Sequence, residues 1–360
     1  LAPLIKLMMI PDAWSKRSKT VPKNHQDLFN FLNSTIEPWD GPAAICATDA
    51  KWVLASSDRN GLRPLRYTIT SDDLFFAGSE TGMIKIPEEN IIEKGKLGPG
   101  QIIAIDLKKG KLFKDKELKD LLAKDYKKYN KQIIDLEKKI SNENEKPNFT
   151  GEDLRKRQYL SGLSIEDLEL ILHPMAEEGK EASGSMGDDT PVAVLSSHFR
   201  PVSHYFRQNF SQVTNPPIDS LRENKVMSLK TRFGNLGNIL DFDNLTEENI
   251  YVLDSPILTN SQFKKFKKFF SKKIKVIDCT FDISSTLKDR LESIREEAET
   301  SVREGSTCLI LSDKNINNQN ASIPSILTVG AVHSHLVKHG LRGYCSLNVQ
   351  CSDALDTHSF

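Results

Sequence analysis

Short apolar runs separated by turn residues fill residues 42–106. The turns include Arg59-Asn60-Gly61 and Gly98-Pro99-Gly100, where glycine permits a positive φ and asparagine favours a tight turn. The runs that predict strands are residues 42–48, 52–55, 65–69, 74–77 and 102–106. Strands this short and closely spaced predict an α+β region built on a layered, meandering sheet.

The pattern changes at residue 115. Lys and Glu or Asp alternate with apolar residues through residues 115–145, at spacings that predict an amphipathic helix with one solvated face. The polar segment 141–146, which ends at Pro147, predicts a linker and a domain boundary.

The last two hundred residues predict helices and strands in alternation. Ser164 and Asp167 have the spacing of a capping box ahead of an apolar run. Near the C-terminus, apolar runs at 275–279, 307–312 and 343–349 enclose two helical patterns at 287–302 and 323–339. This β-α-β-α-β order predicts an α/β region with a parallel sheet.

Composition supports a globular chain with more than one domain. The 360 residues are 38% apolar and 27% charged, with 49 basic and 49 acidic side chains. Neutral charge argues against nucleic acid binding, and the absence of a long apolar span argues against a membrane protein. The five scattered cysteines form no C-x-x-C pair, so we expect a cytoplasmic protein whose cysteines are small buried residues.

Common catalytic motifs are absent from the sequence. No G-x-G-x-x-G or G-x-x-x-x-G-K-[ST] motif accompanies the predicted β-α-β units. His333, His335 and His339 suggest a metal site, because His335 and His339 share a helix face. No carboxylate stands at the spacing of a zinc protease, and zinc would need a third or fourth ligand. We favour a cluster that caps the helix end or contacts a neighbouring domain. The basic, aromatic stretch 264–273 could bind RNA, but its phenylalanine spacing favours one buried stripe with a solvated lysine face.

Seven longer motifs together resemble one family. They occur in one order over nearly the whole chain, at residues 37–44 (EPWDGPAA), 58–66 (DRNGLRPLR), 79–82 (SETG), 94–100 (KGKLGPG), 184–191 (GSMGDDTP), 212–219 (QVTNPPID) and 331–336 (AVHSHL). This set closely resembles the large subunit of the glutamate synthases. The resemblance implies an iron–sulfur flavoprotein that takes ammonia from L-glutamine and adds it, with reducing equivalents, to 2-oxoglutarate.

The resemblance also implies a domain plan. Residues 1–114 are expected to form the C-terminal half of a class II, N-terminal-nucleophile glutaminase domain with a layered α+β fold. Residues 115–163 would form a charged helix and linker, and residues 164–360 an α/β central domain that is incomplete at its C-terminal end. We interpret Leu1 and Phe360 as truncation points of a longer protein. This interpretation predicts exposed apolar surface near both ends of the chain.

The family's catalytic groups are not expected in this chain. Its nucleophile is an N-terminal cysteine whose α-amino group acts as base, and Cys46 inside a strand cannot supply a free amine. We interpret Asn60-Gly61 as a β-turn rather than the family's oxyanion pair, which lies in an earlier motif. FMN and the iron–sulfur cluster would likewise be bound elsewhere in the complete enzyme, so this chain is expected to bind no cofactor or metal.

A channel wall is the role that the resemblance leaves for this chain. Met186, Thr214 and Asn215 match positions at the family's ammonia channel entrance, although the same residues could simply stiffen turns. The expected partners are the remaining domains of the polypeptide, with either a small NADPH-oxidising subunit or ferredoxin as electron donor. The alternative is a non-catalytic scaffold or regulatory protein that reuses both folds.

Overall fold

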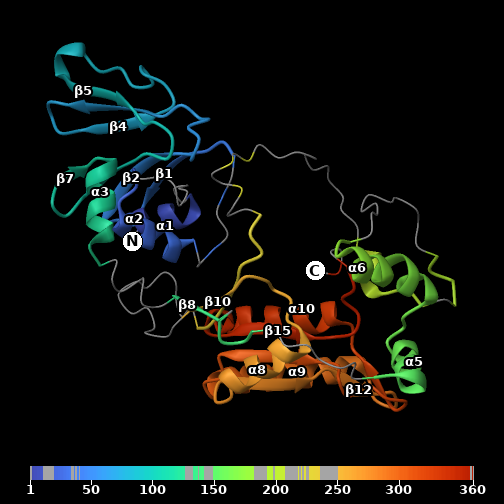
Figure 1. Ribbon diagram of the computed structural model, residues 1–360. Coiled ribbons are helices and arrows are strands. Elements are labelled where there is room, and N and C mark those ends of the chain that lie inside the picture. Colours follow the sequence, from blue (N-terminus) through green and yellow to red (C-terminus); the bar gives the residue numbers. More distant parts are fainter. Residues whose placement is uncertain are drawn as a thin grey trace. The chain divides into compact units, whose positions relative to one another are not determined.

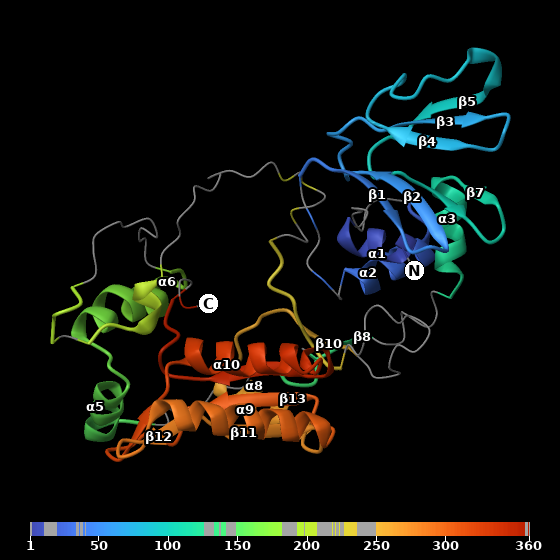
Figure 2. The ribbon, with the colours of Figure 1, turned by 180° about the vertical axis from the view of Figure 1, so that it is seen from behind.

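The computed structural model describes residues 2–10, 20–33, 36, 39, 41–125, 133–136, 138–141, 149–181, 193–197, 199–206, 218, 220, 223, 227–235, 250–356 and 359. It mixes helices with several separate sheets (Figures 1 and 2). The chain forms two compact units. The first comprises residues 1–135, 215–232 and 238–256, and the second comprises residues 136–214, 233–237 and 257–360.

Two antiparallel sheets form the β-rich part of the first unit, as the turn-punctuated sequence predicts. One has the strand order β1-β2-β6-β7 and the other the order β4-β3-β5. Their strands are β1 (Ala44–Thr48), β2 (Trp52–Ser57), β3 (Arg66–Thr70), β4 (Phe75–Gly78), β5 (Ile91–Lys96), β6 (Ile102–Asp106) and β7 (Lys111–Phe113). The core of the unit lies on the central pair, where Leu54 and Ala104 are cross-strand partners and both are buried.

Two of these strands were not predicted. β7 has three residues, too few for a recognisable pattern, whereas β5 alternates half-buried and exposed positions but contains Gly95. Glycine weakens a strand, and here a close contact requires it: a Cβ on Gly95 would collide with the ring of Tyr67 on the neighbouring strand. Gly95 therefore obscured the strand pattern of β5, and the reason for a glycine at this position is visible only in the pairing with β3.

Helices cover the same unit. They are α1 (Ala2–Met9), α2 (Lys23–Leu32) and α3 (Asp115–Leu122), followed by the 3₁₀ turn η2 (Ala123–Asp125); a further turn, η1 (Glu88–Asn90), precedes β5. α1 packs against β2 and α2 and buries Leu7 and Met8. At the start of α3, the Lys114 backbone N–H donates to the Glu117 carboxylate over 3.4 Å, so this carboxylate caps one N–H at the helix N-terminus.

The single helix predicted over residues 115–145 is wrong. Residues 133–135 form β8 (Ile133–Asp135), which pairs in parallel with β10 (Ile250–Leu253) in a sheet of order β8-β10-β9, where β9 is Thr231–Phe233. Ile133 and Ile134 fit a helical stripe and a short strand equally well. Pairing with a strand more than a hundred residues away decides between them, because tertiary contacts override local propensity.

A parallel sheet organises the second unit, and the predicted β-α-β-α-β order is present. The strands β11 (Ile274–Asp278), β13 (Cys308–Ser312) and β15 (Ser346–Gln350) pair in parallel in that order. α9 (Leu287–Arg303) and α10 (Ser325–Lys338) connect them and pack against each other. Ile294, Val332 and Leu311 lie in their shared buried core.

The second unit contains further elements. β12 (Thr280–Asp282) and β14 (Asn320–Ser322) form an antiparallel pair. The helices and turns are α5 (Gly151–Leu160), η3 (Asp167–Leu172), α6 (His173–Glu178), η4 (Val202–Tyr205), α8 (Asn260–Phe269) and η6 (Arg342–Tyr344). The predicted capping box is confirmed, since the Ser164 N–H donates to the Asp167 carboxylate and the Asp167 N–H donates to Ser164 Oγ.

The phenylalanine stripe on α8 is confirmed in part. Phe266 and Phe270 are buried, Phe263 is half-buried, and Phe269 is 39% exposed. Lys267 lies over the Phe263 ring, with its Nζ 4.8 Å from the ring centroid. Two of the four rings therefore lie in the core, and Phe263 stacks with a lysine on the more exposed side of the helix.

Three of the five cysteines are buried as expected, whereas Cys351 is half-buried and Cys46 is exposed. Cys279, Cys308 and Cys345 are buried, and burial raises the pKa of the Cys308 thiol to about 12. Cys46 lies on the exposed face of β1, with Ala44 and Thr48, because alternate residues of a strand point to opposite faces of the sheet. Within the described residues, no helix has the length and apolar content needed to span a bilayer.

Candidate functional site

The turn at Asp58-Arg59-Asn60-Gly61 joins β2 to β3 in the first unit. The Gly61 N–H donates to the carbonyl of Asp58 over 3.1 Å, and Gly61 has a φ of +65°. This is the i to i+3 hydrogen bond of a β-turn, with glycine at the position of positive φ. The interpretation of Asn60-Gly61 as a turn is confirmed.

The Asp58 side chain holds this turn from inside. Its Oδ1 accepts the backbone N–H groups of Asn60 and Leu62, each over 3.0 Å. Its Oδ2 accepts those of Arg63 over 3.0 Å and Ala43 over 3.3 Å. Four backbone donors therefore converge on one buried carboxylate.

The Asp58 main chain extends these links to two other motifs. Its N–H donates to the carbonyl of Ala43 over 2.8 Å, and its carbonyl accepts the N–H of Gly100 over 2.8 Å. Ala43 belongs to the EPWDGPAA motif and Gly100 to the KGKLGPG motif. Three motifs that the sequence shows only as separate segments thus meet at Asp58.

Hydrogen bonding sets the charge of this carboxylate. Burial by itself would raise the pKa of Asp58, but the N–H groups of Leu62, Arg63, Ala43 and Asn60 outweigh burial and lower that pKa below its usual range. A carboxylate with both oxygens bound to backbone donors is a poor general base. Asp58 is therefore suited to fix a loop rather than to move protons.

A pocket of about 360 Å³ lies beside the turn. Its lining combines apolar surface, a guanidinium and an amide, from Ile10, Trp39, Gly41, Pro42, Ala43, Asp58, Arg59 and Asn60. Arg59 Nη1 donates to Asn60 Oδ1 over 3.0 Å. A pocket of this size and mixed lining could hold a small polar ligand or a side chain from another segment of the protein.

Lys6 supports the same loops and was missed by the sequence analysis. It is buried on α1, and its Nζ donates to the carbonyl of Gly100 over 3.3 Å. The available signal was its position as the one charged residue within the apolar run Leu4-Ile5-Lys6-Leu7-Met8. A lysine in such a run has to find a polar partner inside the fold.

The other predicted site residues fall into two groups. Met186, Thr214 and Asn215 lie outside the described residues. Among the histidines of α10, His335 and His339 meet Glu299 of α9, whereas the Nδ1 of His333 accepts a hydrogen bond from Arg342. The expected helix-end capping is present, because His339 Nδ1 lies 2.8 Å from the carbonyl oxygen of His335.

Comparison with known proteins gives two family matches. Residues 4–131 match the family model for glutamine amidotransferases class-II, and residues 156–360 match that for the glutamate synthase central domain. The Asp58 turn and its pocket lie in the first match, and α9 and α10 lie in the second.

Individual relatives agree with both matches. The chain is 52% identical over its whole length to the glutamate synthase [NADPH] large chain of Azospirillum brasilense. It is 38% identical over 98% of its length to the large chain from Bacillus subtilis, and 37% identical over 98% to the chloroplastic ferredoxin-dependent glutamate synthase 2 of Arabidopsis thaliana. It spans 24%, 23% and 22% of these relatives' lengths. The chain belongs to the glutamate synthase family.

Proposed function

We propose that this chain is part of a glutamate synthase that makes L-glutamate from L-glutamine and 2-oxoglutarate. The observation that carries the proposal is the order of an amidotransferase segment and a central-domain segment, with 52% identity over the whole chain to an NADPH-type large chain. The relatives include both NADPH and ferredoxin-dependent enzymes, so either could be the electron donor.

The chain's own part in this activity is a scaffold. Residues 1–114 act as the C-terminal half of the glutaminase domain, 115–163 as a connection, and 164–360 as the central domain. Support comes from Asp58, whose carboxylate accepts four backbone N–H groups and whose side chain and main chain together join three loops. On this proposal the nucleophile, FMN and the iron–sulfur cluster belong to other parts of the enzyme.

A direct assay tests this scaffold role. The purified 360-residue chain should hydrolyse no glutamine, because the proposed nucleophile is not in it. Replacing the matching segment of the Azospirillum brasilense large chain with these residues should give an enzyme that forms glutamate. Glutaminase turnover by the isolated chain would refute the scaffold role, and a folded but inactive chimera would favour the alternative of a regulatory protein.

The central domain also contributes a wall of the ammonia channel on this proposal. Ammonia must pass between sites without protonation by bulk water, which requires a closed path. Met186, Thr214 and Asn215 are the proposed lining, on the family resemblance of their two loops.

Substitution in the chimera tests that lining. Thr214→Trp should raise the ratio of glutamine hydrolysed to glutamate formed, because a bulky side chain would obstruct the path, while Thr214→Ser should leave the ratio unchanged. An unchanged ratio in the Trp variant, with the enzyme folded, would remove Thr214 from the channel.

A further inference from the structure

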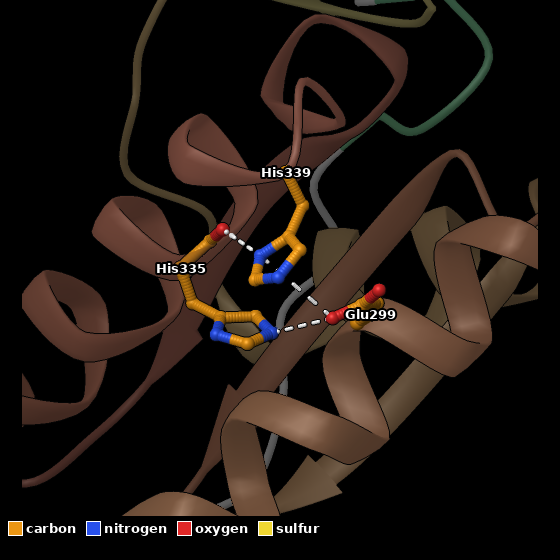
Figure 3. A group of neighbouring side chains, drawn as sticks. All are labelled: Glu299, His335 and His339. Atoms are coloured by element: carbon orange, nitrogen blue, oxygen red, sulfur yellow. Dashed lines mark hydrogen bonds and ion pairs between the residues drawn. The ribbon is translucent and has the colours of Figure 1, made fainter.

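Helices α9 and α10 bring one carboxylate and two imidazoles together. His335 and His339 project from successive turns at the end of α10 toward Glu299 of α9 (Figure 3). Glu299 Oε2 lies 2.6 Å from His335 Nε2 and 3.8 Å from His339 Nδ1. The two rings have centroids 4.2 Å apart.

The neighbouring hydrogen bonds leave these groups suited to bind an ion. Arg303 occupies the other carboxylate oxygen, since its Nε and Nη2 lie 2.9 and 2.8 Å from Glu299 Oε1. Oε2 is thus the oxygen that faces the imidazoles. Because a carbonyl only accepts, His339 Nδ1 must donate to the carbonyl of His335, which leaves the lone pair of its Nε2 available. Histidines that bind metals typically donate their other ring N–H to such an acceptor.

The separations suit one small cation. One ligand atom from each side chain lies within 4.8 Å of the others. Around tetrahedral Zn²⁺, with bonds of about 2.0–2.1 Å, ligand atoms are about 3.3 Å apart. The side chains of Glu299, His335 and His339 are 22%, 19% and 34% exposed, so an ion can reach them from solvent, and binding would draw the ligand atoms together to this spacing.

We propose that Glu299, His335 and His339 form a binding site for a divalent transition metal of the Zn²⁺ class. Two imidazoles and one carboxylate favour zinc, copper or nickel over magnesium and calcium, which prefer all-oxygen sites. Water would complete the coordination. The ion would cross-link α9 to α10 and stabilise the second unit by binding its folded state.

Calorimetric titration of the 360-residue chain with Zn²⁺ tests the site. We expect one ion per chain. His335→Gln and His339→Gln should each lower the affinity by about 100-fold or more, since loss of even an outer-shell partner costs about 10–100-fold. His333→Gln, on the same helix but directed to Arg342, should bind as the parent does.

Cobalt identifies the ligands independently of affinity. Co²⁺ bound by nitrogen and oxygen should give visible d–d bands without the strong near-ultraviolet charge transfer of a thiolate. Thiolate bands would place the ion at cysteines, and Zn²⁺ binding that survives in the doubly substituted His335→Gln/His339→Gln chain would place it away from this cluster. Either result would overturn the proposal. Absence of stoichiometric binding by the parent chain would leave the cluster as a hydrogen-bonded bridge between helices and would equally overturn it.

A fold control accompanies each variant. Circular dichroism and thermal melting without metal should match the parent closely, because all three side chains are partly exposed. Zn²⁺ should raise the melting temperature of the parent and His333→Gln chains and leave that of His335→Gln unchanged.

Discussion

Two carboxylates, Asp58 in the first unit and Glu299 in the second, acquire their partners in different ways. Three of the four N–H groups that Asp58 accepts come from residues 60, 62 and 63, so a short sequence assembles most of its site. Glu299 pairs with Arg303 one turn away, but its histidine partners lie 36 and 40 residues along the chain. A short contiguous sequence can supply most of the partners of a loop carboxylate such as Asp58. A side-chain cluster between two helices, such as that at Glu299, forms only when the tertiary structure brings the helices together.

The two sites also differ in burial. Asp58 is 2% exposed and its partners are backbone groups that cannot be displaced. Glu299 is half-buried, with 22% of its side chain exposed, so solvent and salt reach its ion pairs and weaken them. We therefore expect Asp58 to contribute more to the stability of the first unit than Glu299 contributes to that of the second. The contribution of Glu299 should depend on the salt concentration and on any ion bound to it.

Removing the buried carboxylate should have the largest effect. Asp58→Ala leaves four backbone N–H groups without this acceptor, which should lower the free energy of unfolding of the first unit by about 3 kcal/mol. Asp72→Ala, in an exposed turn of the same unit, should change it by less than about 0.5 kcal/mol. Urea unfolding measures both, and equal effects would contradict the anchoring role.

The turn glycine gives a smaller test of the same region. Gly61→Ala forces a side chain into positive φ and places its Cβ 3.1 Å from Pro99 Cγ, so we expect a loss of about 2 kcal/mol. Gly110→Ala has a similar φ of +59° but open space around its Cβ, so it should cost only the backbone part, about 1 kcal/mol. Thermal melts compare the two, and identical losses would show that packing on Pro99 is unimportant.

The dependence of stability on pH and salt should distinguish the contributions of Asp58 and Glu299, and this is the smallest of the expected effects. Four backbone N–H groups outweigh burial and lower the pKa of Asp58, while Arg303 first and His335 second lower that of Glu299. Because the folded pKa is the lower one in each case, the stability is complete above the unfolded pKa and is lost as pH falls through the folded pKa.

The variants assign these contributions. Asp58→Asn should remove acid-dependent stability that persists in high salt, and Glu299→Gln should remove the part that salt already suppresses. Urea unfolding between neutral and acid pH, at low and high salt, measures both. If high salt leaves the Glu299 contribution to stability unchanged, the distinction between the buried Asp58 site and the partly exposed Glu299 site is wrong.

Local patterns predicted much of the fold. Five of the strands in the first unit and the parallel order of β11, β13 and β15 follow from short apolar runs and turn residues. β5 was missed because Gly95 interrupts its pattern, and 133–135 was misassigned because its two isoleucines suit a helix as well as a strand. In both cases the deciding contact is with another strand.

By itself, the sequence determined the Asp58 turn, because aspartate, asparagine and glycine at fixed spacing satisfy one another locally. It also determined the family, through motifs in a fixed order. The meeting of Asp58 with Ala43 and Gly100, and of His335 and His339 with Glu299, was decided only by tertiary structure. Sequence spacing constrains groups within a turn of one another, whereas groups far apart along the chain meet only when buried cores fix the elements that carry them.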